Sequence, residues 1–357
     1  MPVLSDSVRG AFAKQIAWCE SLGSPFTAAV LAILAADGEA GGAAAALLAD
    51  WPGDPVADAL PLRMAGAFHA LALAGRAPEL AACYPPNAPG DSRRLRGAVL
   101  EALSAHEAEI RRFLASPPQT NEVGRSAVLV GGFHAIARWS GLPLRTLEIG
   151  ASAGLNTIWD RYLYRLGAVS WGPEASPLVL APEWRGAPPA LAADLRVVER
   201  AACDRAPIDI ADAEARLRLR AYVWADQRQR LDRLDAALSL ALQAGVRVEK
   251  ADAAPWLEGR LVQPAEGRTT VLYHSIMWSY VSAETRSRIG ETIRAASARA
   301  TTTAPFAWLR FEPPAPDRRP ELHVTLWPGE RQRRLAAAHP HGDAVEWLEG
   351  ASHPVGF

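Results

Sequence analysis

The sequence predicts a three-layer α/β sandwich with a mostly parallel sheet, preceded by a region of helices. Two observations support this fold class. Before residue 119, apolar residues recur at the three- to four-residue spacing of helices. After about residue 144, short strand-like runs alternate with helical stretches, which is typical of crossover units that pair in parallel. We therefore expect a helical region over 1–118 and an α/β domain over 119–357.

The helical region carries recognisable start and stop signals. Ser24 followed by Pro25 is typical of an N-cap and a first helical turn, and predicts a helix over Phe26–Ala36. A second helix is predicted over Arg93–Leu114, because the Pro117-Pro118 pair that follows cannot continue it. The apolar face of a helix between these two consists of Leu60, Met64, Phe68 and Leu71.

The α/β domain is predicted from short β-rich runs. A long helical pattern, with a break, covers Ala213–Ala244, and another helix covers Ser282–Ala298. Residues 164–194 are rich in glycine and proline and interrupt the alternation, so we expect an inserted flap over the sheet. The predicted strands are 144–149, 195–199, 246–251, 269–277, 305–311, 323–327 and 344–348.

The composition indicates a globular protein without a strongly charged partner. Hydrophobic residues make up 49%, charged residues 22%, and the formal net charge is −1. Nucleic-acid binders normally show a basic face, and the sequence contains no basic block that would form one. No apolar run reaches the ~18 residues that span a bilayer. The N-terminus has no signal-peptide pattern, and three scattered cysteines form neither a disulfide framework nor a metal knuckle. We therefore expect a cytoplasmic protein that acts on a small molecule and has no metal site.

The candidate site is the run Leu147–Asn156, which lies between the first strand and an expected amphipathic helix. In open parallel sheets, ligands bind outside the carboxyl ends of the strands. Small residues there let a ligand approach the backbone, and a helix N-terminus offers free N–H groups. Dinucleotide binding is disfavoured, because Ser152 and Leu155 stand where its G-x-G-x-x-G pattern needs glycine.

A serine hydrolase is an alternative interpretation of this run. Gly150-x-Ser152-x-Gly154 matches the nucleophile elbow, and an aspartate and a histidine follow in the required order. Two features speak against it. The hydrolase fold has several strands before the elbow, whereas only helices are predicted here, and Glu148 has no role beside an elbow.

The third interpretation is binding of S-adenosylmethionine. Glu148-x-Gly150-x-Ser152-x-Gly154 resembles the E-x-G-x-G-x-G loop of class I methyltransferases, although Ser152 replaces the central glycine. That family places acidic residues at the ends of the second and third strands, near the ribose and the adenine. The resemblance implies a Rossmann-like, class I methyltransferase-like domain. It implies as cofactor-binding residues Glu148, Gly150, Ala151, Ser152, Gly154, Glu199, Asp252 and Ala253.

Further polar residues are candidates for catalysis and substrate binding. His274 follows an apolar run and is expected at the carboxyl edge of the sheet. The ordinary pKa of a histidine, about 6.5, suits a general base, although a structural histidine is equally consistent. The polar run 119–125 lies at the boundary between the two regions, where sites often form, but a helix cap explains it equally well. The substrate-binding candidates are Gln119, Asn121, Glu122, Arg125, Asp160, Tyr164, Ser275 and Trp278.

The chain as a whole resembles a bacterial family known only as domain of unknown function 2332. The resemblance covers most of the chain and rests on the runs 119–125, 148–164, 222–227, 274–275 and 339–342. It implies no reaction, because no activity comes with the family. We therefore expect an S-adenosylmethionine-dependent methyltransferase acting on a small molecule, with a non-catalytic metabolite-binding protein of the same fold as the other alternative.

Overall fold

The computed structural model describes residues 3–87, 91–315 and 318–348, and divides into two compact units. The first unit is Met1–Thr120 with Ala211–Asp235, and the second is Asn121–Ile210 with Ala236–Phe357. The helical region was predicted over 1–118 only, but the segment 211–235 also belongs to the first unit. None of the helices within the described residues combines the length and the apolar composition that a membrane span requires.

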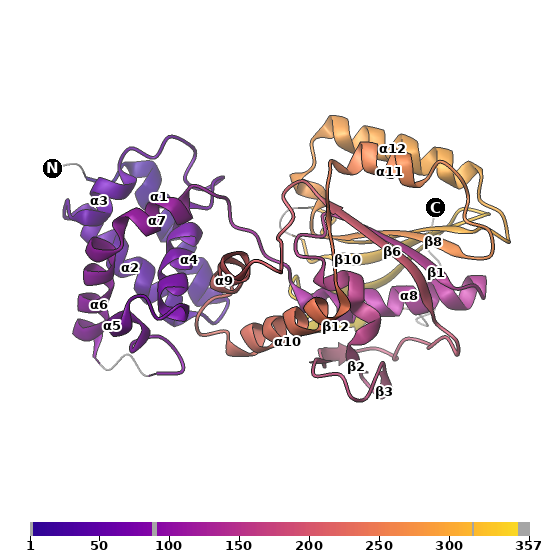
Figure 1. Cartoon of the computed structure of the whole chain (residues 1–357), viewed down its shortest axis with the longest axis horizontal. Helices are drawn as coiled ribbons and strands as arrows, with labels where there is room; N and C mark the ends of the chain where they lie inside the picture. The colour runs from indigo at the N-terminus through magenta and orange to yellow at the C-terminus, as the bar shows by residue number, and fades with distance from the viewer. Residues whose placement is uncertain (1–2, 88–90, 316–317, 349–357) are drawn as a thin grey trace. The chain divides into compact units, whose positions relative to one another are not determined.

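The first unit is built from helices throughout its described residues (Figure 1). The predicted helix over Phe26–Ala36 is present as part of α2. The stretch predicted as one helix over Arg93–Leu114 is instead two helices, because the backbone leaves the helical conformation at His106. The helices are α1 (Asp6–Ser21), α2 (Pro25–Glu39), α3 (Ala43–Leu48), α4 (Leu60–Leu73), α5 (Pro78–Ala81), α6 (Ser92–Ala105), α7 (Glu107–Leu114) and α9 (Ala213–Ala221).

The segment 211–235 belongs to this unit because its side chains complete the helical core. Ala225 is buried with the core of α1, α2 and α4, and Trp224 packs against the same cluster. The ring of Tyr222 lies 5.4 Å from that of Phe113, centroid to centroid. Asp226 accepts hydrogen bonds from the backbone N–H of Phe26, at 2.9 Å, and from the hydroxyl of Ser24. Asp226 therefore caps α2 from a distant part of the chain.

We expect Asp226→Ala to lower the free energy of unfolding by about 2 kcal/mol, because hydrogen bonds to a charged group contribute about that much. The substitution leaves the N–H of Phe26 at the start of α2 without its acceptor. Urea unfolding followed by tryptophan fluorescence measures the change. Asp50→Ala removes an exposed aspartate from the same unit and serves as the control. Equal stability of the two variants would contradict the capping role.

The second unit contains a nine-stranded sheet in the order β5-β12-β11-β10-β9-β8-β1-β6-β7. The strands β7, β6, β1, β8 and β9 pair in parallel, whereas β9, β10, β11 and β12 pair antiparallel. The sheet is thus mixed and largely parallel, as predicted. Its strands are β1 (Leu144–Ile149), β5 (Glu183–Arg185), β6 (Val197–Asp204), β7 (Glu249–Lys250), β8 (Thr269–Ser275), β9 (Phe306–Glu312), β10 (Glu321–Trp327), β11 (Arg331–Ala338) and β12 (Ala344–Trp347).

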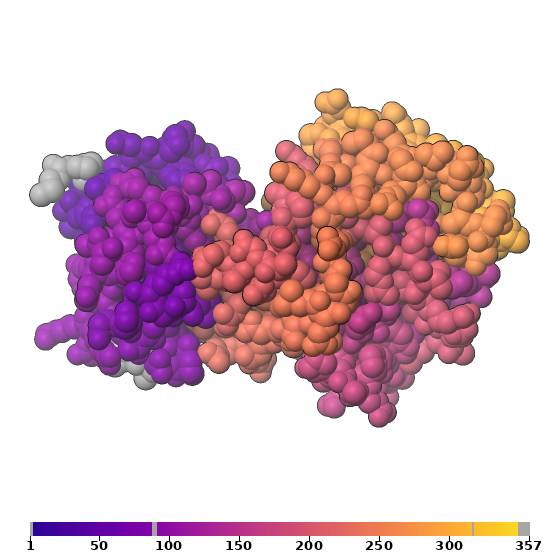
Figure 2. Space-filling view, in the orientation of Figure 1, coloured from indigo at the N-terminus to yellow at the C-terminus, as the bar shows by residue number. Residues whose placement is uncertain are grey.

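Helices cover both faces of this sheet (Figure 1). On one face lie α11 (Ala253–Arg260) and α12 (Ala283–Ala298), whose apolar residues are buried against Leu147, Ile149 and Leu272. Figure 2 shows these two helices side by side at the surface, in orange. On the other face lies α8 (Ser126–Ser140), which contacts β9, β10 and β11. The helix α10 (Arg228–Ala244) contains residues of both units, and three short 3-10 helices lie in the second unit: η1 (Val123–Arg125), η2 (Leu155–Arg161) and η3 (Trp278–Tyr280).

The segment predicted as an inserted flap forms a small sheet of its own. It consists of β2 (Leu163–Leu166), β3 (Val169–Trp171) and β4 (Val179–Leu180), in the order β3-β2-β4. Aromatic rings hold this sheet in place, since Trp171 stacks on Trp159 with ring centroids 5.7 Å apart. The chain then joins the main sheet as β5, beside β12.

Candidate functional site

The carboxyl ends of the parallel strands form the edge at which ligands of such sheets bind. From β1 the chain passes to β6 and β7 on one side of β1, and then to β8 and β9 on the other side. This reversal places a topological switch point beside β1, at the loop Gly150–Gly154. A Cβ atom at Gly150 would lie 2.9 Å from Met277 Cγ, so the loops that follow β1 and β8 are in contact.

The loop after β1 has the left-handed backbone that its glycines predict. The φ angles are +68° at Gly150, +54° at Ser152 and +73° at Gly154. A Cβ at Gly154 would lie 2.7 Å from Val248 and 2.8 Å from Val246, so a side chain does not fit there. The predicted α-helix after this loop is wrong. The segment is the 3-10 helix η2 (Leu155–Arg161), which is kinked at Ile158.

The acidic residue at the end of the second parallel strand is Asp204, which the sequence analysis missed. Its carboxylate accepts the N–H of Ser152 at 2.8 Å and the N–H of Ala206 at 2.9 Å. The strand was predicted to end at Glu199, but β6 continues to Asp204 because it pairs with the whole of β1. Pro207, a turn residue shortly after Asp204, was the available sequence signal for this strand end.

The predicted position of Glu199 at the end of this strand is therefore wrong. Glu199 lies opposite Arg145 in the register of β1 and β6, about 16 Å along the strand from Asp204 at the usual rise per residue. It forms ion pairs with Arg145 at 2.8 Å and Arg268 at 2.9 Å. Burial opposes its charge, but these two arginines outweigh burial and lower the pKa of Glu199.

Asp252 lies at the candidate edge, as predicted. It follows β7 and is the N-cap of α11, where its carboxylate accepts the N–H of Ala254 at 3.1 Å. The preceding residue, Ala251, donates its N–H to the carbonyl oxygen of Asp204 at 3.0 Å. Two carboxylates thus follow neighbouring strands at this edge. Ala253 begins α11, and Ala151 is buried and donates its N–H to Cys203 O at 3.1 Å.

Glu148 is buried beneath the loop rather than exposed at the edge. The Tyr273 hydroxyl lies 3.0 Å from Glu148 Oε2 and 3.2 Å from the carbonyl oxygen of Asn156. Burial raises the pKa of Glu148 to about 8, and the nearby charge of Asp204 acts in the same direction. A protonated Glu148 also explains both contacts, because it can donate to the Tyr273 hydroxyl while that hydroxyl donates to Asn156.

The polar run before α8 anchors the loop region. Asn121 Oδ1 accepts the N–H of Leu155 at 2.9 Å, and the carbonyl oxygen of Glu122 accepts the Asn156 amide at 3.3 Å. Arg125 donates to the carbonyl oxygen of Ser275, at the end of β8, at 3.0 Å. Gln119, the remaining substrate candidate of this run, belongs to the first unit.

His274 lies at the predicted strand end, but both of its ring nitrogens are engaged. Its Nδ1 is 2.7 Å from Glu312 Oε1, and its Nε2 accepts the indole N–H of Trp308 at 3.1 Å. The ring is 1% exposed and stacks on Trp278 at 5.1 Å. Because both ring nitrogens are engaged, this geometry argues against the predicted role of general base. Glu312 also accepts the N–H of Met277. Like Asp204, it is an acidic residue at a strand end that the sequence analysis did not single out, although prolines follow it directly.

The substrate candidates Asp160 and Tyr164 lie on different elements, because η2 ends at Arg161 and Tyr164 lies in β2. Asp160 instead binds Arg200 through two contacts, at 2.9 Å and 3.0 Å. Tyr164 is buried and donates its hydroxyl to Trp159 O at 2.6 Å. Both residues therefore hold the flap and η2 in place.

A cavity of about 300 Å³ lies beside η2 and β6 in the second unit. Arg200 is fixed there by Asp160, and the cavity is basic as a whole because two further arginines line it. Its lining residues are Thr157, Ile158, Arg161, Arg200, Ala201, Ala202, Ala244, Gly245, Val246 and Arg247.

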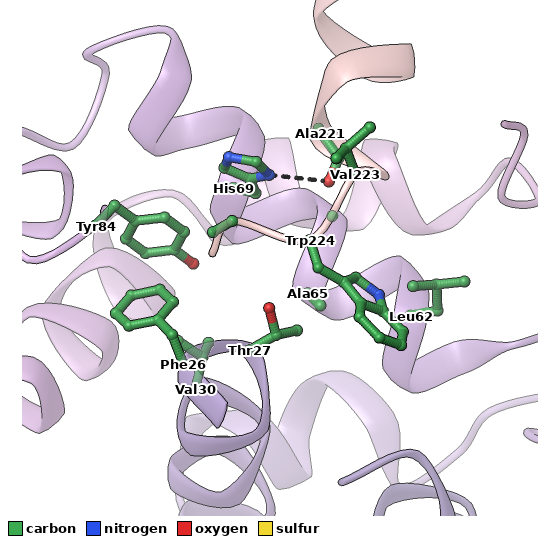
Figure 3. A pocket seen from close by; sticks show the side chains of 12 residues that line it. Phe26, Thr27, Val30, Leu62, Ala65, His69, Tyr84, Ala221, Val223 and Trp224 are labelled. Atoms are coloured by element: carbon green, nitrogen blue, oxygen red, sulfur yellow. Dashed lines mark hydrogen bonds between the residues drawn. The ribbon is translucent and has the colours of Figure 1, made fainter. Parts of the chain in front are cut away.

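The first unit has a much smaller cavity of about 10 Å³ (Figure 3), which is roughly the volume that one water molecule needs. Around it lie Thr27, Tyr84 and His69, whose Nδ1 is 3.2 Å from the carbonyl oxygen of Ala221. Burial lowers the pKa of His69 to about 4, so the ring is neutral at pH 7. The cavity is too small for a metabolite.

Comparisons with known proteins identify a family but no activity. A family model described as an uncharacterized protein conserved in bacteria matches residues 9–347. No curated protein matches the chain, and no solved structure matches it.

Proposed function

The chain belongs to the bacterial family DUF2332, and from the geometry of its sheet edge we propose that it binds S-adenosylmethionine and transfers the methyl group to a small molecule. The observation that carries this proposal is the pair of carboxylates at the ends of β6 and β7, next to the left-handed loop after β1. The cofactor would supply a methyl group on a sulfonium, which a nucleophile can attack directly.

In this proposal Asp204 takes the ribose-binding role that the sequence analysis gave to Glu199. An ionised carboxylate has about four lone-pair sites, so Asp204 can accept ribose hydroxyls in addition to the N–H groups of Ser152 and Ala206. Acidic residues at this position hold ribose hydroxyls in other doubly wound sheets. Asp252 and the first turn of α11 would contact the adenine.

The protein's own contribution would be to orient the two reactants. Glu312 holds the N–H groups of Met277 at 3.1 Å and Trp278 at 3.3 Å, which fixes the loop after β8. Met277 contacts the loop after β1, and the aromatic ring of Trp278 follows it in sequence. A fixed aromatic ring at this place can attract a cationic group through its π face.

Isothermal titration with S-adenosylhomocysteine and S-adenosylmethionine tests the proposal. We expect one binding site per chain, and at least about tenfold weaker binding for Asp204→Asn, which keeps an acceptor for the N–H of Ser152. Glu199→Gln is the matched control, because Glu199 lies far along the same strand, and its affinity should equal that of the wild type. No heat with either ligand, or equal weakening by both variants, would refute the proposal. Binding without methyl transfer would identify the non-catalytic alternative.

The hydrolase alternative gains no support from the geometry. Ser152 Oγ is buried, and among the described residues it has no hydrogen-bond partner. His274 cannot activate it in this arrangement, since both ring nitrogens are engaged by Glu312 and Trp308. A serine nucleophile requires a base within hydrogen-bond reach.

A further inference from the structure

Two histidines and an aspartate meet in the turn between β11 and β12. The nitrogen or oxygen ligand atoms of His339, His341 and Asp343 all lie within 4.8 Å of one another. No metal site is predicted from the sequence, but the fold brings Asp343 beside the two histidines as a third ligand. We propose that this turn binds a divalent first-row transition metal, of the zinc or iron type, with coordination positions left open for water or for an oxygen of a substrate.

The distances require only a small closure around a metal. His339 Nδ1 lies 3.8 Å from Asp343 Oδ2, and the rings of His339 and His341 are 5.1 Å apart and nearly perpendicular. Ligand atoms around a tetrahedral zinc, bound at about 2.0–2.1 Å, are roughly 3.4 Å from one another. Side-chain rotations that shorten these distances by up to about 1.5 Å bring the ligand atoms to this spacing. If His339 binds through Nδ1, that atom gives up the backbone N–H of His341, which it accepts at 3.3 Å.

The backbone of this turn is fixed from two sides. His339 N donates to Ala344 O, and Gly342 N donates to His339 O, both at 2.8 Å. A Cβ at Gly342 would lie 2.1 Å from the carbonyl oxygen of Gly124, so this close approach admits only glycine. A fixed backbone holds the three side chains near one another before a metal arrives, which lowers the entropic cost of binding.

The donor set selects the class of metal. Two imidazoles and one carboxylate suit zinc, iron and similar ions, whereas calcium and magnesium prefer oxygen ligands only. Three protein ligands are the usual number in catalytic metal sites, which keep a position open. The side chains of His339 and Asp343 are 38% and 43% exposed, so water and small molecules can reach the open positions.

The turn lies at the same edge of the sheet as the proposed S-adenosylmethionine site at the loop Gly150–Gly154. β10 is antiparallel to both β9 and β11, so the end of β11 is at the edge where the parallel strands end. Arg125 links the two places, because it donates to Pro340 O at 3.1 Å and to Ser275 O at 3.0 Å. The metal proposal does not depend on S-adenosylmethionine binding, since none of its three ligands has a role in that site.

Titration of the metal-free, tag-free full chain with Co²⁺ tests this inference. We expect one Co²⁺ per chain with a visible ligand-field absorption band, and at least tenfold weaker binding for His339→Gln and for Asp343→Asn. His323→Gln is the matched control, because His323 pairs with Glu321 on β10 and lies outside the trio. Circular dichroism and thermal unfolding show whether each variant is folded.

A second measurement with Zn²⁺ distinguishes ligation from an indirect effect. The ring ¹⁵N resonances of His339 and His341 should shift when Zn²⁺ is added, and those of His323 should not. The inference is overturned if the wild type binds no Co²⁺, if folded variants of the trio bind it as tightly as the wild type, or if the two histidine resonances stay unchanged. Titration of the metal-free chain with S-adenosylhomocysteine tests the proposed function separately.

Discussion

Glu148→Gln is expected to make the free energy of unfolding less dependent on pH. In the wild type we expect this free energy to fall by about 2.5 kcal/mol between pH 6 and pH 9, a size that follows from the raised pKa of Glu148, and the variant should not show this fall. The folded-state pKa of about 8 lies above the ordinary value of 4.5. The folded protein therefore keeps a proton that the unfolded chain releases. The resulting stabilisation is fully present below the unfolded pKa and is lost as the pH rises through the folded pKa.

Glutamine reproduces the contact without the charge. Its amide N–H can donate to the hydroxyl of Tyr273, as the protonated carboxyl of Glu148 does across 3.0 Å. Urea unfolding of wild type and variant at pH 6 and pH 9 gives the comparison. We expect the variant to be more stable than the wild type at pH 9, and the difference to shrink at pH 6. Glu258→Gln, at an exposed position on α11, controls for the loss of a carboxylate. A difference between wild type and Glu148→Gln that is the same at both pH values would contradict the raised pKa.

Gly124→Ala is expected to lower the free energy of unfolding by about 3 kcal/mol, since overpacking against rigid neighbours costs up to this amount. A Cβ at Gly124 would lie 2.1 Å from the carbonyl oxygen of His341. The backbone fixes the position of the Cβ, and the carbonyl oxygen is itself a backbone atom, so no side-chain rotation relieves the clash. The turn that carries His339 and Asp343 must then move, and Co²⁺ binding should weaken along with stability.

The matched control is Gly290→Ala in α12, where nothing lies within 4 Å of the added Cβ. Alanine is a better helix former than glycine, so this variant should gain about 0.5–1 kcal/mol. Urea unfolding of the two variants distinguishes the effect of the clash between residue 124 and His341 from the general effect of replacing a glycine by alanine. A Gly124→Ala protein as stable as the wild type would show that the two segments are not held at this distance.

Much of the fold follows from local patterns in the sequence. β1 has the predicted bounds, Leu144–Ile149, and α12 begins within a residue of its prediction at the Ser282 cap. The loop Gly150–Gly154 has positive φ at both glycines. These features depend on periodicity, capping and turn chemistry, which act over a few residues and are therefore legible in the sequence.

Other helices and strands differ from their predictions because packing and pairing set their limits. α6 and α7 separate at His106, and β11 was missed because its first residues are charged and exposed. The segment 211–235 joins the helical unit through Asp226 and Trp224, far from that unit in sequence. Local propensity carries no information about such distant partners.

The sequence by itself determined the α/β class of the fold, the glycine loop after the first strand and the acid that follows the third parallel strand, Asp252. Tertiary structure alone decided which acid stands beside that loop, since pairing with β1 extends β6 to Asp204 and leaves Glu199 bound to two arginines. It also placed Asp343 beside His339 and His341, and it engaged both ring nitrogens of His274 in hydrogen bonds. The physical reason is the same in each case: a side chain's type is written in the sequence, but its neighbours are fixed by strand register and by the packing of distant segments.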